Sequence, residues 1–154
     1  MSAEKRLKSL GIELPGRPAA LANYVGAVRD GSLLFLSGHI PVDSKGDLVV
    51  TGKLGRELTV EQGYEQARIV GLNALSTMRD MLGSLDNVRK IVRVLGLVSS
   101  AEGFREQPKV VNGFSDLFVD VFGEEIGRHA RSAVGVAELP KGAPVEVELI
   151  ASVV

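Results

Sequence analysis

Cysteine is absent from this chain of 154 residues, and aromatic residues make up only 5% of it. The absence of cysteine excludes disulfides, thiolate nucleophiles and cysteine-ligated iron–sulfur clusters. The scarcity of aromatic side chains removes the surfaces on which single-stranded nucleic acids stack. A formal net charge of −1 also lacks the basic excess of a nucleic-acid-binding protein, so we do not expect nucleic acid as a partner.

Sequence patterns for metal and cofactor sites are missing as well. The two histidines, His39 and His129, lie far apart and outside any HExxH pattern, so a zinc site has little support. There is no GxSxG elbow and no GxGxxG fingerprint. The stretch GDLVVTGKL resembles a phosphate-binding loop, but it has five residues between its glycines instead of four. We expect no metal and no cofactor, and each histidine is either a general base or a structural residue.

The chain contains no apolar run long enough to span a membrane and no signal-peptide pattern at its start. Its hydrophobic fraction of 45% and charged fraction of 24% are typical of a soluble globular protein. A single domain of this length buries about 68–70% of its unfolded surface, so it needs no disulfide or metal for stability. We therefore expect one cytoplasmic domain that does not bind membranes.

Apolar residues that recur every three or four positions predict two main helices. The first spans 59–82, where Thr59 and Gln62 are placed to form a capping box at its start. The second lies within 109–123, and a short additional helix is expected within 2–14. A proline-containing loop or extended lead-in should follow the short helix over 15–23.

The other apolar segments predict strands. Asp30-Gly31 between two of them is a hairpin signal, and a turn-rich loop over 41–50 should return to a short strand. The order predicts an α+β fold, in which a mostly antiparallel sheet of five or six strands carries both helices on one face. Because the strands are apolar in both phases, the uncovered face predicts a closed homo-oligomer. The main strands are expected at 24–29, 33–40, 88–100, 133–139 and 145–154.

The last two predicted strands carry charges in an otherwise apolar tail. Period-two geometry places Arg131 on the same face as the small residues Ala133 and Gly135, which leaves space beside its guanidinium. A guanidinium in such a place can bind a carboxylate through two parallel hydrogen bonds. The alternative is a surface ion pair without function. In the final strand, Glu146 and Glu148 share one face.

The distance between these charges depends on how the two strands pair. If they form a tight hairpin near Gly142, Arg131 lies opposite about Ser152. Glu146 is then about six residues further along, on the order of 20 Å away. An arginine and a glutamate that serve one site would therefore have to come from different subunits, which the expected homo-oligomer permits.

The tail ARSAVGVAELPKGAPVEVE resembles the signature of the YjgF/Rid family, which is also called RidA-like or L-PSP endoribonuclease. Three earlier stretches, NYVGAVRDG, LFLSGHIPVD and VVNGFSDLF, resemble further motifs of the same family in the same order. The resemblance extends over roughly residues 22–154, and only the N-terminal helix lies outside it. We therefore expect a divergent subgroup with an N-terminal extension at 1–19 and a single family domain at 20–154.

This resemblance implies a chorismate-mutase-like (ferredoxin-like) subunit that forms a homotrimer with clefts between neighbouring subunits. The best-understood members hydrolyse reactive enamines and imines of 2-amino acids to 2-keto acids and ammonia, without a cofactor. The implied activity is that of a 2-iminobutanoate/2-iminopropanoate deaminase-like hydrolase with a small carboxylate-bearing substrate. Two alternatives stay open: a non-catalytic trimer that binds a small carboxylate for regulation, and an endoribonuclease or translation inhibitor with a basic groove.

The resemblance also assigns roles to six residues. Arg131 would hold the substrate carboxylate, and Glu146 would orient or activate the water that attacks the C=N carbon. A closed cleft would raise the pKa of Glu146 by desolvation, although a nearby arginine would oppose this. Tyr24 could instead be a simple strand aromatic, and Asn112 could bond only to backbone near its helix start. The residues that would line or support the cleft are Tyr24, Gly38, Asn112 and Ala133.

Four positions depart from the family pattern. Ala133 replaces the usual cysteine, which removes any thiol role but leaves the backbone carbonyl for ligand binding. Asn23 replaces a common proline, and His39 replaces a common glutamine. His129 stands where proline or alanine is usual. The arginine and the glutamate are in place, so a small carboxylate is the expected ligand.

Overall fold

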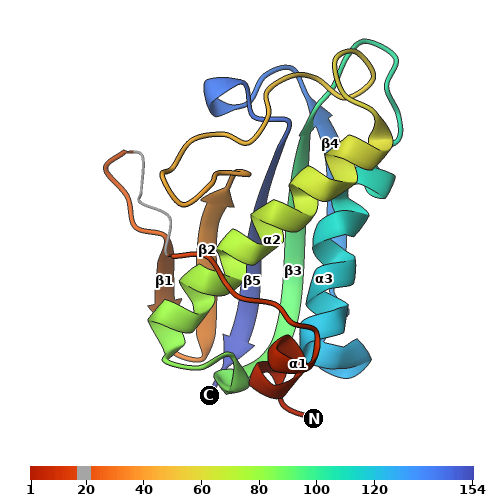
Figure 1. Cartoon of the computed structure of the whole chain (residues 1–154). Coiled ribbons are helices and arrows are strands. Elements are labelled where there is room, and N and C mark those ends of the chain that lie inside the picture. Colours follow the sequence, from red (N-terminus) through yellow and green to blue (C-terminus); the bar gives the residue numbers. More distant parts are fainter. Residues whose placement is uncertain (17–21) are drawn as a thin grey trace.

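The computed structural model describes residues 1–16 and 22–154. Part of the predicted lead-in, and the predicted boundary between residues 19 and 20, therefore lie outside the described residues. Figure 1 shows the helices stacked on one side of a twisted sheet. The elements, in chain order, are α1 (Ala3–Ser9), β1 (Ala27–Asp30), β2 (Leu33–His39), α2 (Val60–Leu82), η1 (Leu85–Asn87), β3 (Val88–Ser99), α3 (Gln107–Gly127), β4 (Ala130–Val136), η2 (Pro140–Gly142) and β5 (Val145–Val153).

The sheet has five strands in the order β1-β2-β5-β3-β4 among the described residues. Every neighbouring pair is antiparallel except β3 and β4, which are parallel. β2 and β3 run in the same direction on either side of β5, and α2 connects them across the sheet (Figure 1). The predicted α+β layer, with a mostly antiparallel sheet and both main helices on one face, is confirmed.

The predicted hairpin between the last two strands is wrong. β4 pairs with β3, where Arg131 lies opposite Val94, and β5 inserts between β2 and β3. The reason is α3, since a helix that crosses the sheet after β3 returns the chain parallel to β3. The predicted short strand within 41–50 is also absent from the named strands, and only a single bridge joins Val42 and Leu48.

Local sequence signals set the ends of α2. The predicted capping box is confirmed: the Thr59 amide donates to Gln62 Oε1 at 2.9 Å, and the Gln62 amide donates to Thr59 Oγ1 at 3.2 Å. Gly83 ends the helix with a left-handed φ of 75°, a conformation that glycine adopts without steric cost. No helix in residues 1–16 or 22–154 combines the length and apolar character needed to cross a bilayer.

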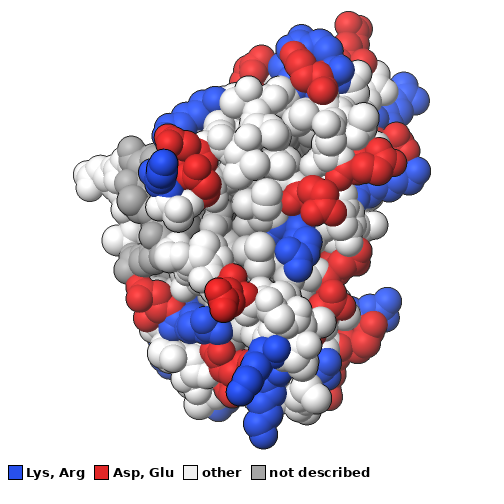
Figure 2. Space-filling view, viewed as in Figure 1, with Lys and Arg blue, Asp and Glu red and all other residues white. Residues whose placement is uncertain are grey.

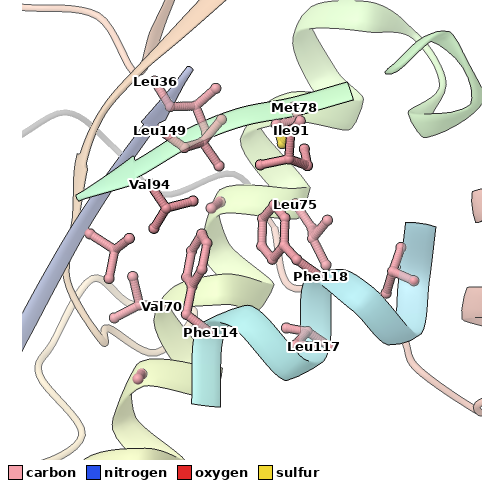
Figure 3. Close-up of a cluster of buried hydrophobic side chains, with 14 of the residues drawn as sticks. Leu36, Val70, Leu75, Met78, Ile91, Val94, Phe114, Leu117, Phe118 and Leu149 are labelled. Carbon is pink, nitrogen blue, oxygen red and sulfur yellow. The ribbon is translucent and has the colours of Figure 1, made fainter. Parts of the chain in front are cut away.

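The main hydrophobic core lies between the sheet and the two long helices (Figure 3). Phe114 and Phe118 of α3 stack with ring centroids 4.2 Å apart, and both side chains are fully buried. The helices approach closely where Gly113 faces α2, because a Cβ on Gly113 would overlap the carbonyl oxygen of Tyr64. Each fully buried phenylalanine contributes about 2–3 kcal/mol to folding.

The N-terminal helix α1 docks against this core. Ala3 and Leu7 are buried in the main cluster. Glu4 accepts two hydrogen bonds from the Arg79 guanidinium, at 3.1 and 2.6 Å, and a third from the Leu85 amide at 3.0 Å. One carboxylate thus ties α1 to the last turn of α2 and to η1, which fixes the position of the N-terminal segment.

Among the described residues, no helix or strand covers the face of the sheet opposite the helices. On it lie the residues Val28, Phe35 and Val134, which are 53%, 40% and 43% exposed. The alternate positions Leu34 and Leu36 face the helices and are 0% and 5% exposed. The open face therefore carries apolar side chains that water contacts unless a further chain covers them.

Candidate functional site

Arg131 lies on β4 and points toward α3, on the same face as Ala133, with which the period-two pattern grouped it. Its Nη1 donates to Asn112 Oδ1 at 2.8 Å and to Ser115 Oγ at 3.0 Å. Its Nη2 donates to the carbonyl oxygen of Pro108 at 3.3 Å. These three partners recur at intervals of four and three residues, so they lie on one face of α3. The helix therefore holds the guanidinium in one orientation, and we call this group the arginine half-site.

The arginine half-site presents free hydrogen-bond donors. A guanidinium has five N–H groups, and the three bonds to α3 use both on Nη1 and one on Nη2. Within the described residues, Arg131 has no further hydrogen-bond partner, which leaves its Nε–H and one Nη2–H. The Nε–H and the Nη2–H on the same edge of a guanidinium are parallel, and such an edge can bind both oxygens of a carboxylate side-on. Burial lowers the pKa of Arg131 and Asp116 raises it, but an arginine stays cationic.

His129 contacts Ser115, one of the residues that hold Arg131. Its Nδ1 lies 2.6 Å from the carbonyl oxygen of Gly127, and its Nε2 lies 2.9 Å from Ser115 Oγ. Burial lowers the pKa of His129, and the positive charges of Arg131 and Lys90 lower it further, although the bond to Gly127 opposes this shift. His129 is therefore neutral near pH 7.

Glu146 lies on β5, on the open face of the sheet, beside Gly38 of β2. A Cβ on Gly38 would overlap Glu146 Oε1, so only glycine leaves room for the carboxylate in this position. Burial raises the pKa of Glu146, and the negative charge of Glu148 adds to this effect. A half-buried carboxylate with a raised pKa is suited to accept a proton near neutral pH.

Two contacts hold the residues that follow Tyr24 beside β2, the strand that carries Gly38. Ser37 Oγ donates to the Val25 carbonyl at 2.6 Å, and the Ser37 amide donates to the Gly26 carbonyl at 3.0 Å. Tyr24 itself is 45% exposed. Its chain segment thus lies next to the strand that carries Gly38. We call Glu146, Gly38 and Tyr24 the glutamate half-site.

His39 stabilises the strand behind the glutamate half-site. It is buried, with Nδ1 2.7 Å from the Ser37 carbonyl and Nε2 2.8 Å from Thr77 Oγ1 of α2. Burial lowers its pKa. Because both ring nitrogens are engaged inside the fold, His39 is a structural residue, and it is not placed to act as a general base.

The two half-sites do not meet within one chain. Arg131 contacts α3 on the helix-covered face, whereas Glu146 alternates with the buried Val145 and Val147 and lies on the opposite face. β3 also lies between their strands, so two strand spacings, about 10 Å, separate them. The sequence predicted this separation from a hairpin register that does not exist, and the strand order and the two faces of the sheet are its actual causes.

The remaining predicted residue, Ala133, lies two positions after Arg131 on the same face of β4. It is half-buried and packs against the main core.

Asn112 also borders a hollow of about 390 Å³ between α2 and α3, whose lining includes Tyr64 and Asp116. Tyr64 donates to Asp116 there at 2.8 Å, and this carboxylate raises the pKa of the phenol to about 12. Residues 1–16 and 22–154 bring together no cluster of three histidine, cysteine or carboxylate side chains that could hold a metal ion.

Sequence reasoning missed two members of the arginine half-site, Ser115 and the Pro108 carbonyl. Both could have been found from the sequence, because Pro108 lies four residues before the predicted Asn112 and Ser115 three residues after it, so the three share one face of a helix. His129 was recognised as a possible base but not as a neighbour of Ser115. That contact depends on how the chain turns after α3, which no local pattern encodes.

Comparisons with known proteins agree with this fold. The family described as "YjgF/chorismate_mutase-like, putative endoribonuclease" matches residues 4–153. The crystal structure of "a putative endoribonuclease" from Shewanella oneidensis superimposes with a TM-score of 0.93 at 35% identity, covering 99% of this chain and 100% of that one. The chain belongs to the YjgF/Rid family, and its chorismate-mutase-like fold is confirmed. The match begins at residue 4, so it includes α1, which the sequence motifs had placed outside the resemblance.

Two curated relatives cover nearly the whole chain. "Protein TCP17" of Trypanosoma cruzi is 48% identical over 144 residues, which are 94% of this chain and 89% of the relative. The "2-iminobutanoate/2-iminopropanoate deaminase" of Dermatophagoides farinae is 30% identical over 139 residues, which are 90% of this chain and 92% of the relative. This chain is therefore a Rid-family protein with similarity to a deaminase.

Proposed function

We propose that this protein hydrolyses 2-imino acids, and the enamines from which they form, to 2-keto acids and ammonia. The observation that carries the proposal is Arg131, which α3 anchors through three hydrogen bonds while its Nε–H and one Nη2–H have no partner among the described residues. That arrangement fits a carboxylate, the group common to all 2-imino acids. The similarity to an iminobutanoate deaminase supports the same substrate class.

The chemistry needs only positioning and one proton carrier. With the substrate carboxylate on Arg131, water adds through its oxygen to the electrophilic C=N carbon, and Glu146 accepts the proton that the water loses. The protonated glutamic acid then returns this proton to the nitrogen, which gives a carbinolamine. As the C–N bond breaks, the hydroxyl proton of the carbinolamine passes by way of Glu146 to the departing nitrogen, so ammonia leaves as the carbonyl forms. Water is the only co-reactant, and the pKa of Glu146, raised by burial, suits both transfers.

The complete site requires more than one subunit. Arg131 and Glu146 lie on opposite faces of one sheet, so one substrate can reach both only if the glutamate half-site of a neighbouring chain docks near Arg131. The exposed apolar side chains of the open face, such as Phe35 and Val134, favour such an association. We propose a cytoplasmic homotrimer with one cleft at each subunit boundary.

The endoribonuclease alternative has less support. It requires a continuous basic groove, whereas Figure 2 shows acidic and basic side chains interspersed over the helix-covered face. The formal net charge of −1 points the same way. The other alternative, a trimer that binds a small carboxylate without turnover, uses the same Arg131 and differs only in the role of Glu146.

The decisive experiment follows imine loss in the presence of the purified protein. An amino-acid oxidase generates 2-iminopropanoate in situ, and semicarbazide traps what remains. The wild-type protein should accelerate imine loss, and Glu146→Gln should lower kcat by about 100-fold or more because it removes the proton carrier. Failure of the wild type to accelerate the loss of any imine in a panel, combined with 2-keto acid binding, would support the non-catalytic carboxylate-binding alternative.

The pH profile of this reaction gives a separate prediction. Glu146 must be ionised to accept a proton, so kcat should fall as pH decreases through its raised pKa. Glu148→Gln removes a charge that raises this pKa, so the acid limb of the profile should move to lower pH while the plateau stays. An acid limb that does not move in Glu148→Gln would contradict the assignment of that limb to Glu146.

Gly38→Ala should lower the activity without destabilising the fold. The new methyl group would meet the end of the Glu146 side chain, which can rotate away, so the fold should persist while the carboxylate is displaced. We expect kcat to fall about tenfold or more with a melting temperature near that of the wild type. Gly16→Ala is a matched control because, its chain neighbours apart, no atom of residues 1–16 or 22–154 lies within 4 Å of its added Cβ. Equal kcat values for the two variants would contradict a catalytic placement of Glu146 over Gly38.

A further inference from the structure

We propose that Ser115 and His129 form a positioning relay that holds Arg131 ready for a carboxylate, and that protonation of His129 switches this relay off. The inference rests on the proposed role of Arg131 in carboxylate binding. It concerns His129, which stands where the family pattern has proline or alanine. The protein would then release its carboxylate ligand in acid through a group that does not touch the ligand.

Hydrogen bonds link Gly127, His129, Ser115 and Arg131 in series, and the Gly127 carbonyl at one end fixes the direction of each. The Gly127 carbonyl can only accept, so His129 Nδ1, 2.6 Å away, carries a hydrogen. In the neutral ring, Nε2 then has a lone pair, and the Ser115 hydroxyl must donate its single hydrogen to it across 2.9 Å. Ser115 Oγ therefore keeps only lone pairs toward Arg131 Nη1 at 3.0 Å. Neutral His129 thus makes Ser115 an acceptor that fits the guanidinium.

Protonation of His129 reverses one of these bonds. Nε2 becomes a donor, so the Ser115 hydroxyl has to turn its hydrogen away from the ring. Two cations, the imidazolium and the guanidinium, then direct donors at the same oxygen. The Ser115 oxygen has two lone pairs, but repulsion between the two cations weakens its hold on Arg131, so we expect Arg131 to shift away from the position that the Asn112 and Pro108 contacts otherwise maintain.

The charges around His129 keep the relay in its neutral state near pH 7. Arg131 on β4 and Lys90 on β3 are both cationic and lower the pKa of His129, as burial does. α3 contributes the neutral Ser115 to the ring, and the carboxylate of Asp116 on the same helix raises the pKa of Arg131. Lys90 is itself fixed, because its Nζ donates to the Glu125 carbonyl. The switch should therefore operate only in acid.

A measurement without ligand tests the relay directly. Nitrogen NMR of the intact protein should show His129 with its hydrogen on Nδ1 near neutral pH. During acidification from about pH 8 to about pH 5, the side-chain resonances of Arg131 should shift with the same midpoint as the ring of His129. In His129→Gln, whose amide oxygen can accept from Ser115, the Arg131 resonances should stay constant. An Arg131 signal that is indifferent to the His129 titration would overturn the proposal.

Ligand binding provides the functional readout. The affinity of the wild type for 2-oxobutanoate should fall by about tenfold or more over the same pH range, since a hydrogen bond to a charged group is lost. The loss of affinity in acid should be much smaller in His129→Gln than in the wild type, because the glutamine side chain does not titrate. Glu146 titrates in the wild type and in His129→Gln alike, so its effect on the affinity for 2-oxobutanoate cancels when the two proteins are compared. Equal acid losses in the two proteins would overturn the switch.

Failure of the relay and failure of the proposed function give different results. If Arg131→Ala binds 2-oxobutanoate as tightly as the wild type, the carboxylate site is wrong, and the NMR titration still decides whether His129 controls Arg131. Ser115→Ala serves as a second variant that should fold normally, because the hydroxyl is half-buried and small. It should bind more weakly at every pH and lose the pH dependence, and a wild-type pH profile in this variant would contradict the relay.

Discussion

Arg131→Lys should lower kcat/KM for 2-iminopropanoate by about 100-fold, which corresponds to about 3 kcal/mol. Lysine keeps the positive charge but replaces the planar guanidinium, so it cannot offer two parallel donors to a carboxylate. It also cannot reproduce the contacts with Asn112, Ser115 and the Pro108 carbonyl that orient the side chain on α3. The effect should appear in KM as well as in kcat, because a displaced carboxylate also misplaces the C=N carbon.

Arg128→Lys is the matched control for this prediction. Arg128 lies three residues earlier, is exposed, and pairs with Glu124 at 3.0 Å on the surface. The same chemical change there should leave kcat/KM within about twofold of the wild type, since an exposed ion pair contributes little. If Arg131→Lys were as active as Arg128→Lys, a simple positive charge would suffice at position 131 and bidentate binding would be disproved.

Gly113→Ala should destabilise the protein by about 3 kcal/mol and lower its Tm by roughly 10 °C. Helix propensity alone gives the opposite sign, because alanine is better than glycine in a helix interior by about 1 kcal/mol. The tertiary contact decides the outcome: the new methyl group would overlap the Tyr64 carbonyl, and a backbone atom cannot rotate away as a side chain can. α2 and α3 would have to separate, which loosens the packing of Phe114 and Phe118 between them.

Thermal unfolding of the variant at fixed protein concentration measures this effect. Asp120→Ala, an exposed change on the same helix, should stay within about 0.5 kcal/mol of the wild type. A Gly113→Ala protein with a Tm equal to or above that of the wild type would contradict the close approach of the helices. Because α3 also carries Asn112 and Ser115, the variant should also bind carboxylates less tightly in the residual folded fraction.

Local chemistry made part of the site predictable. The small residues beside Arg131 and the alternation of Glu146 with valines follow from the period of a strand, whatever its neighbours are. The same holds for the capping box at Thr59 and Gln62, whose partners are three residues apart. The family motifs assign roles to the same two residues. Arg131 and Glu146 could therefore be chosen as site residues without knowing how the strands pair.

Strand pairing could not be predicted in this way. The alternation in β4 is the same whether it pairs with β3 or β5, because side-chain direction does not depend on the partner strand. The choice follows from α3, which returns the chain parallel to β3, and from the space left for β5 between β2 and β3. For this reason the predicted opposition of Arg131 and Ser152 was wrong, although the side-chain faces were right.

The sequence by itself determined the class of fold, the ends of α2, and the identity of the two charged residues that carry the proposed chemistry, whereas α3 is longer than the predicted 109–123. Those features depend on contacts within a few residues and on patterns that repeat along one element. Only the tertiary structure decided that Arg131 and Glu146 face opposite sides of the sheet, that Gly113 lies against the Tyr64 carbonyl, and that His129 lies within hydrogen-bond distance of Ser115. Each of these depends on where the chain turns after α3 and on how closely two helices pack, and neither is encoded in local periodicity.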